Sequence, residues 1–269
     1  MSIEVKNLSL FYVNRQVLHD ISFSVEKGTL LSVLGHNGAG KSSLFRCILG
    51  LEKSYTGQVF VDGANTRSLS TKEMAKHIAY IPQSSSPAFN YSAFDIVLMG
   101  TTSSLRGLDN PKKEDCERVW SALDKLGICH LASRCYHRLS GGEQQLVLIA
   151  RALSQNAGIL MLDEPAASLD FGNQLMLMRH ARELADEGYT VIQTTHNPEQ
   201  SYMFSDRIIC IGGGRILRDG HPKDILDITT VRELYGENVH VLSLFDDRAR
   251  VCIPDSIVST SKSEMESTS

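Results

Sequence analysis

The sequence of 269 residues has no run of about 20 uninterrupted apolar residues, the length that a membrane-spanning helix needs. Its start, MSIEVKNLSL, has neither the basic leader nor the apolar stretch of a signal peptide. Basic residues are not in excess, because 27 Lys and Arg stand against 31 Asp and Glu, a formal net charge of −4. That balance lacks the electrostatic footprint of a general nucleic-acid binder. We therefore expect a cytoplasmic chain that binds no nucleic acid.

Cysteine is scarce and scattered. The six cysteines form no CxxC pair and stand at no zinc-binding spacing from histidine. We expect reduced, half-buried thiols rather than a disulfide framework or a metal site. The composition is otherwise that of a globular protein, with 42% hydrophobic and 22% charged residues, and the length suits one body with an added lobe.

Strand and helix patterns alternate along most of the chain, which predicts an α/β fold. The apolar run Leu30–Leu34 is typical of a central strand covered on both faces, and a helix over Lys41–Ile48 is expected to follow it. Residues 206–211 and 215–218, joined by three glycines, predict a hairpin. The other expected strands are 3–11, 17–25, 58–61, 78–81, 159–162 and 190–194, and the other expected helices are 71–77, 174–187 and 229–235.

The pattern changes between residues 90 and 155, where helical periodicity replaces the β-branched runs. Its clearest stretch, residues 112–126, places four apolar residues on one helical face. They are Val119, Trp120, Leu123 and Leu126. We therefore expect a helical lobe inserted in the α/β body. Residues 259–269 are polar and nearly free of hydrophobic side chains, which predicts a disordered tail.

Residues 35–42, GHNGAGKS, match the phosphate-binding pattern G-x-x-x-x-G-K-[ST]. A chance glycine-rich turn is the alternative, but the expected strand before the motif and helix after it favour a phosphate loop. In such a loop successive N–H groups point at a phosphate, Lys41 reaches the β- and γ-phosphates, and Ser42 binds Mg²⁺. The expected nucleotide-binding residues here are Gly35, Asn37, Gly38, Ala39, Gly40, Lys41, Ser42 and Ser43.

Two carboxylates, Asp163 and Glu164, follow the apolar strand expected at residues 159–162. That strand would deliver both to its carboxyl end. We expect Asp163 to hold the Mg²⁺ shell and Glu164 to polarise the water that attacks the γ-phosphate. An acidic pair after a strand is more often a helix cap when it stands alone. Together with the phosphate loop, it favours ATP hydrolysis.

The decisive motif is LSGGEQ at residues 139–144, before an expected helix, which resembles the signature of ATP-binding cassette (ABC) proteins. Other landmarks of that family occur in its order. Gln83 matches the Q-loop glutamine, Asp170 belongs to a D-loop, and His196 matches the switch histidine. Tyr12 stands where the family keeps an aromatic residue that stacks on adenine. Read singly, each is more often a loop or packing residue, so the constellation carries the resemblance.

The resemblance implies a P-loop NTPase of the ABC cassette type, with a mixed sheet core, an antiparallel β edge and an inserted helical lobe. It covers residues 1–240, with the lobe at approximately residues 88–155. Residues 241–258 would form a C-terminal extension before the disordered tail at 259–269.

In the family, two cassettes meet head to tail, so the resemblance implies a homodimer in the ATP-bound state. The signature residues Ser140, Gly141 and Gly142 of one subunit would close over the γ-phosphate held by the other. Asp170 would couple the two sites.

The resemblance also implies the catalytic roles. Glu164 would act on the attacking water, His196 would contact the γ-phosphate and keep Glu164 oriented, and Gln83 would serve both catalysis and the metal shell. Ser42, Gln83 and Asp163 are thus the expected metal ligands, and ATP and Mg²⁺ the implied cofactors. A non-hydrolytic module would be expected to have lost Glu164 or His196, and both are present.

Within the family, residues 95–100, 112–115 and 195–198 look like those of importer ATPases for iron–siderophore, haem and vitamin B12. That likeness implies membrane permease subunits as partners, a substrate-binding protein upstream, and a peripheral place on the cytoplasmic face of the plasma membrane. Phe89, Tyr91 and Phe94 near the Q-loop are either part of the docking groove for the permease or lobe core.

Two other functions remain open. One is an importer ATPase for another cargo, such as molybdate or zinc. The other is a soluble ABC ATPase of translation or DNA repair, a class that usually carries two cassettes or a long coiled-coil insertion. Leu139 stands only 56 positions after Gln83, which suits a helical lobe and is too short for a coiled-coil arm.

Overall fold

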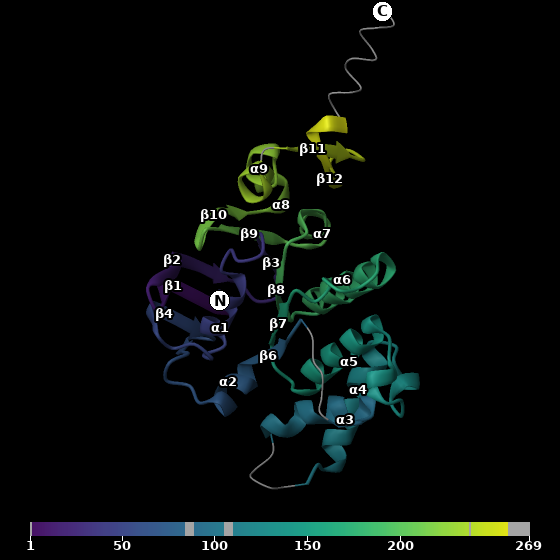
Figure 1. Ribbon diagram of the computed structural model, residues 1–269. Helices are drawn as coiled ribbons and strands as arrows, with labels where there is room; N and C mark the ends of the chain where they lie inside the picture. The colour runs from purple at the N-terminus through teal and green to yellow at the C-terminus, as the bar shows by residue number, and fades with distance from the viewer. Residues whose placement is uncertain (1, 84–88, 105–109, 237, 258–269) are drawn as a thin grey trace, which may run out of the picture.

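The computed structural model describes residues 2–83, 89–104, 110–236 and 238–257 (Figure 1). The tail expected to be disordered, residues 259–269, lies outside these ranges. No helix within the described residues is both long and apolar enough to cross a membrane. All six cysteines lie in the described ranges as free thiols, with Cys47 and Cys210 buried and the other four partly buried.

The central layer is a six-stranded sheet with the strand order β10-β9-β3-β8-β7-β6. Five strands are parallel, and β10 pairs antiparallel with β9 at one edge. Its strands match the expected ranges to within one or two residues. They are β3 (Leu30–Leu34), β6 (Ile78–Ile81), β7 (Ile159–Asp163), β8 (Thr190–Thr195), β9 (Arg207–Gly212) and β10 (Arg215–Gly220).

A second, antiparallel sheet packs beside the first and gives the fold its expected antiparallel edge. Its order is β2-β1-β4-β5, formed by β1 (Ile3–Tyr12), β2 (Arg15–Val25), β4 (Tyr55–Val61) and β5 (Ala64–Asn65). Helix α1 (Lys41–Ile48) lies between the two sheets, because its buried residues Leu44 and Phe45 share one apolar cluster with residues of both. The shorter helix α2 (Thr71–His77) leads into β6.

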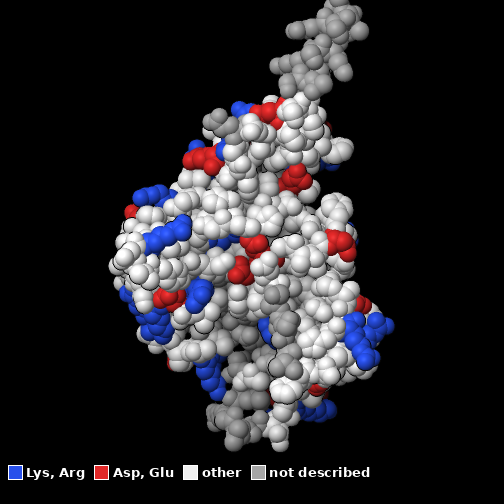
Figure 2. Space-filling model, viewed as in Figure 1, with Lys and Arg blue, Asp and Glu red and all other residues white. Residues whose placement is uncertain are grey.

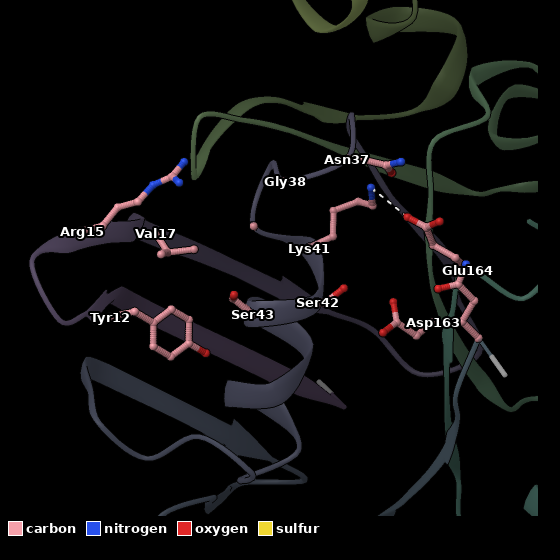
Figure 3. Close-up of a pocket in the computed structure, with 12 residues that line it drawn as sticks. Tyr12, Arg15, Val17, Asn37, Gly38, Lys41, Ser42, Ser43, Asp163 and Glu164 are labelled. Carbon is pink, nitrogen blue, oxygen red and sulfur yellow. Dashed lines mark ion pairs between the residues drawn. The ribbon is translucent and has the colours of Figure 1, made fainter. Parts of the chain in front are cut away.

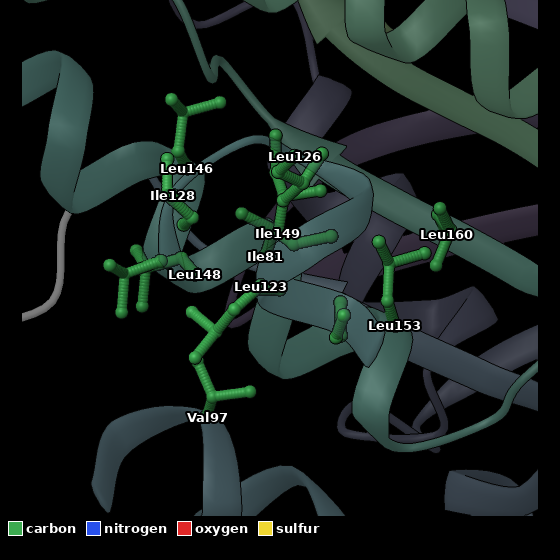
Figure 4. Close-up of a cluster of buried hydrophobic side chains, with 14 of the residues drawn as sticks. Ile81, Val97, Leu123, Leu126, Ile128, Leu146, Leu148, Ile149, Leu153 and Leu160 are labelled. Atoms are coloured by element: carbon green, nitrogen blue, oxygen red, sulfur yellow. The ribbon is translucent and has the colours of Figure 1, made fainter. Parts of the chain in front are cut away.

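The helical lobe is inserted in the chain between β6 and β7. It contains α3 (Ala93–Leu98), η1 (Met99–Ser104), α4 (Lys113–Lys125), η2 (Cys129–Leu131), η3 (Tyr136–Arg138) and α5 (Gly141–Ser154). Figure 4 shows its core, where Val97 of α3, Leu123 of α4 and Ile149 of α5 belong to the same buried cluster as Ile81 and Leu160 of the central sheet. The lobe therefore shares a hydrophobic core with the α/β body.

The prediction that Trp120 shares one helical face with Val119, Leu123 and Leu126 is wrong. Val119, Leu123 and Leu126 are at most 5% exposed, but Trp120 is 48% exposed. The three buried residues are spaced i, i+4 and i+7, whereas Trp120 is turned about 100° from Val119 around the helix axis. Its ring packs at the surface against Phe94, with ring centroids 5.3 Å apart.

The elements that follow β7 in the chain complete the central sheet and add a C-terminal hairpin. Helix α6 (Phe171–Asp186) forms the crossover between β7 and β8, and α7 (Pro198–Phe204) follows β8. After the β9–β10 hairpin come α8 (Pro222–Ile225), α9 (Ile228–Tyr235) and a separate two-stranded hairpin of β11 (Val239–Leu244) and β12 (Ala249–Pro254). A third apolar cluster, which includes Tyr202 and Leu234, joins α7, α9 and the hairpin to the sheet.

Candidate functional site

The phosphate-loop motif connects β3 to α1 in a conformation that depends on glycine. Gly38 and Gly40 have positive φ angles of 83° and 108°. A Cβ atom at Gly35 would lie 2.3 Å from the carbonyl oxygen of Ile211, a distance that no side chain tolerates. Among the described residues, no side chain caps the N-terminus of α1 and no acidic residue stands in its first turn. The first N–H groups of this helix are therefore available to an anion.

A pocket of about 460 Å³ opens in front of this loop (Figure 3). It brings together residues from β1, β2, the phosphate loop, the segment after β6 and the end of β7. The lining residues are Tyr12, Arg15, Val17, Asn37, Gly38, Gly40, Lys41, Ser42, Ser43, Gln83, Asp163 and Glu164. Of the expected loop residues, Gly35 and Ala39 do not line the pocket, and Ala39 is buried.

Lys41 and Glu164 form an ion pair across this pocket. The Lys41 Nζ lies 3.1 Å from Glu164 Oε1 and also donates to the carbonyl oxygens of Gly35, at 2.7 Å, and His36, at 3.2 Å. Only 4% of Lys41 is exposed. The second carboxylate oxygen of Glu164, Oε2, lies 3.3 Å from Nδ1 of His196. Glu164 is thus held between a cation and an imidazole.

Asp163 is held by two hydroxyl groups from the neighbouring strands. Thr194 of β8 donates from Oγ1 to Asp163 Oδ1 at 2.6 Å, and Tyr80 of β6 donates to Asp163 Oδ2 at 3.3 Å. Burial first, and then the charge of Asp163, raises the pKa of Tyr80 to about 12, so its hydroxyl remains a donor. Figure 3 shows the Asp163 carboxylate on the side of the pocket where Ser42 lies.

Thr194 also fixes Glu164, because its Oγ1 accepts a hydrogen bond from the Glu164 backbone N–H at 2.9 Å. Glu164 has a φ angle of 45°, a left-handed conformation that costs a side-chain-bearing residue about 1–2 kcal/mol. One buried hydroxyl therefore supports both carboxylates. Thr194 and Tyr80 were not among the expected site residues, and the available signal was a polar residue near the carboxyl end of each strand adjacent to β7.

The signature and D-loop residues form a second group outside this pocket. Ser140 caps α5 in a capping box with Glu143, and its N–H donates to Glu143 Oε2 at 2.8 Å. This hydrogen bond holds the pKa of the Glu143 carboxyl below its ordinary value. Asp170 caps α6 by accepting from the N–H of Asn173.

Close packing joins the signature to the D-loop. A Cβ atom at Gly142 would lie 2.5 Å from the Asn173 Oδ1, and one at Gly141 would lie 3.4 Å from a methyl carbon of Leu169. None of Ser140, Gly141, Gly142 or Asp170 lines the pocket that contains Lys41. His196 borders a smaller neighbouring pocket, which it shares with Glu164.

On the face shown in Figure 2, basic and acidic side chains are interspersed.

A family model described as ABC transporter matches residues 18–167, more than half of the chain. The chain belongs to the ABC transporter family. An uncharacterized ABC transporter ATP-binding protein of Haemophilus influenzae is 38% identical over 242 residues, covering 90% of this chain and 92% of that protein. A hemin import ATP-binding protein of Bordetella bronchiseptica is 36% identical over 252 residues, covering 90% of this chain and 95% of that protein.

The solved structures agree. An inward-facing ABC transporter described as of metal-chelate type superposes on this chain with a TM-score of 0.84 at 31% identity, covering 94% of this chain and 97% of that one. The ABC cassette fold and the resemblance inferred from the motifs are therefore confirmed. This ABC protein is an ATP-hydrolysing subunit, like the ATP-binding proteins that it matches.

Proposed function

We propose that the pocket in front of the phosphate loop binds Mg-ATP, with the expected residues in the expected roles. Tyr12 stacks on adenine, and the loop residues with the open N-terminus of α1 hold the phosphates. Lys41, already between a carboxylate and two carbonyl oxygens, exchanges part of this contact for the β- and γ-phosphates. A hydroxyl, a carboxylate and an amide oxygen, from Ser42, Asp163 and Gln83, are ligands of the kind Mg²⁺ prefers.

Glu164 is the proposed general base for the attacking water. Its oxygens face Lys41 and His196, which fix the carboxylate on two sides while leaving it at the pocket wall. Glu164 accepts the proton of the water as it attacks the γ-phosphate, and a Mg²⁺ ion held by Asp163 and Ser42 would neutralise the developing negative charge. His196 keeps the carboxylate oriented and contacts the γ-phosphate.

The active unit is proposed to be a head-to-tail homodimer. Ser140, Gly141, Gly142 and Asp170 lie outside the pocket of their own subunit, so they are available to complete the pocket of a second copy. The capped N-terminus of α5 would then point at the γ-phosphate of the partner's ATP. Hydrolysis removes the phosphate that bridges the two subunits and lets them separate.

The cargo is proposed to be a metal chelate such as an iron–siderophore, haem or cobalamin. Support comes from the relative named for hemin import and the structural neighbour described as of metal-chelate type. The cassette itself would act at the cytoplasmic face of the membrane with permease subunits and an upstream substrate-binding protein. Phe89, which is 67% exposed, is proposed to contact the permease, while Tyr91 and Phe94 pack partly against the lobe core.

The observation that carries this proposal is the meeting of Lys41, Asp163 and Glu164 in one pocket. Its test is steady-state ATP hydrolysis by the full-length chain. Glu164→Gln should lower kcat by a factor of about 10² or more while ATP still binds, because a general base typically contributes 10²–10⁴-fold. Glu114→Gln, at an exposed position on α4, is the matched control and should be neutral. Unchanged turnover in Glu164→Gln would contradict the assignment.

The cargo is tested in cells whose gene for this chain is deleted and replaced by the natural gene or by Lys41→Ala. Uptake of iron–siderophore, haem and cobalamin should include one that is lost with Lys41→Ala and restored by the natural chain. Loss of molybdate or zinc uptake alone would favour the other cargo class. If no uptake changes, the importer assignment fails and a soluble ABC ATPase gains support.

A further inference from the structure

The backbone of His196 is held by a side chain from the C-terminal part of the chain. The hydroxyl of Tyr235, at the end of α9, donates to the carbonyl oxygen of His196 at 2.8 Å. Tyr235 lies 39 residues further along the chain and is half-buried in the cluster beneath the C-terminal hairpin. Burial raises the pKa of Tyr235, so this hydroxyl stays protonated and remains a donor.

The other side of the same turn is fixed by its own side chains. Thr195 Oγ1 accepts from the N–H of Asn197 at 3.0 Å, and Asn197 caps α7 by accepting from the N–H of Gln200 at 3.0 Å. The imidazole of His196 is 49% exposed, and its contact with Glu164 is 3.3 Å. The position of this ring therefore depends on the backbone that carries it.

The element that carries Tyr235 is tied to the C-terminal hairpin. Arg232 of α9 donates to the carbonyl oxygen of Val239 at 2.9 Å and pairs with Asp255 at 2.8 Å. The hairpin is in turn tied to α7, the helix after His196. The N–H of Cys252 donates to Glu199 Oε1 at 3.0 Å.

A second tyrosine donates its hydroxyl to a backbone carbonyl of a different residue. Tyr202 of α7 donates to the carbonyl oxygen of Asp247 at 2.7 Å, and the guanidinium of Arg250 lies 4.8 Å from the centre of its ring. Tyr202 and Tyr235 thus each give one hydroxyl to one backbone carbonyl in the same region. Only one of these carbonyls belongs to the proposed catalytic residue.

We infer that Tyr235 is a positioning residue for ATP hydrolysis, which sets the backbone of His196 and through it the contact between the imidazole and Glu164. The inference rests on the proposed role of His196. If Tyr235 has this role, the C-terminal segment that carries it, α9 with the β11–β12 hairpin, supports the proposed ATP site.

The test compares Tyr235→Phe with Tyr202→Phe in the full-length chain, because each substitution removes one hydroxyl and keeps the ring. Tyr235→Phe should lower kcat about three- to tenfold, the effect of one lost hydrogen bond, without changing KM for ATP. Tyr202→Phe should leave kcat unchanged. Both variants should lose a similar, small amount of thermal stability.

A double-mutant cycle with His196→Ala separates positioning from folding. Alanine keeps the backbone carbonyl at position 196, so Tyr235 still makes its hydrogen bond, but the imidazole is gone. If Tyr235 acts through that ring, Tyr235→Phe should have no further effect on kcat in the His196→Ala background. A full additional loss of kcat there would show a general structural role and overturn the inference.

Two other outcomes have distinct meanings. If Tyr235→Phe leaves kcat unchanged while His196→Ala lowers it, the positioning role of Tyr235 fails and the proposed function stands. If His196→Ala itself leaves kcat unchanged, the catalytic assignment of His196 fails, and the inference about Tyr235 falls with it.

Discussion

Thr194→Val tests whether one hydroxyl supports both of the carboxylates that are proposed to take part in ATP hydrolysis. Valine keeps the size of the side chain and suits a buried strand, so β8 should form as before. The substitution removes the hydrogen bond to Asp163 Oδ1, at 2.6 Å, and the acceptor for the Glu164 N–H, at 2.9 Å. Thr194 is fully buried, so water cannot replace either bond.

The magnitude follows from the two bonds lost. A hydrogen bond to a charged group contributes about 1.5–3 kcal/mol and one between neutral groups about 0.5–1.5 kcal/mol. Thr194→Val should therefore lower the free energy of unfolding by about 2–4 kcal/mol, measured by urea denaturation. The turnover of ATP should fall by about 10- to 100-fold, as is usual when a group that orients metal ligands is removed.

Thr190→Val on the same strand is the matched control. Thr190 is also buried and shares one hydrogen bond of 2.8 Å with the hydroxyl of Ser2, far along β8 from the carboxylates. Thr190→Val should lower the free energy of unfolding by about 1 kcal/mol and leave the turnover of ATP unchanged. The reasoning is refuted if Thr194→Val keeps normal turnover, or if Thr190→Val lowers turnover as much.

Three further predictions concern binding, packing and thiol reactivity. Lys41→Ala should abolish ATP binding measured by calorimetry, because it removes the cation at the pocket wall that is proposed to contact the β- and γ-phosphates. Tight binding would contradict the phosphate-loop assignment. Leu123→Ala should lower the free energy of unfolding by about 2–5 kcal/mol, because it leaves a cavity in the lobe core. Trp120→Ala at the surface should lower the free energy of unfolding clearly less, and equal losses would be inconsistent with this packing. Burial raises the pKa of both Cys47 and Cys210 to about 12, so both thiols stay neutral from pH 7 to 9. They should react with a thiol reagent only as fast as the chain unfolds. Mass spectrometry that showed labelling at the rate of the partly buried cysteines would refute this.

The sequence predicted local elements well where a single hydrophobic pattern dominates the segment. The almost wholly apolar run Leu30–Leu34 forms a strand whose five residues are all buried, and α1 begins at Lys41 as expected. The motifs also indicated which residues meet in the pocket in front of the phosphate loop, since the glycines and the carboxylates stand at strand ends that a parallel sheet brings to one edge. Trp120 was expected on the apolar face of its helix and is instead exposed. Composition alone does not distinguish an apolar residue within the buried stripe of a helix from one that stands beside that stripe.

Contacts across strands and between distant segments were out of reach. Thr194 meets Asp163 because β7 and β8 pair in the register that places these two residues side by side, and a single sequence does not reveal that register. Tyr235 reaches His196 through packing of the C-terminal cluster, and nothing local to either residue signals it. The residues that support the proposed catalytic groups are therefore the part of the site that the structure adds.

The central claim is that two copies of this chain close around ATP, each completing the pocket of the other. Its most direct test is light scattering of purified Glu164→Gln with and without Mg-ATP, because slow hydrolysis should keep the closed state populated. The account predicts a shift from monomer to dimer that requires Mg-ATP and is absent when Lys41→Ala is added. A chain that binds Mg-ATP and remains a monomer would contradict the head-to-tail arrangement.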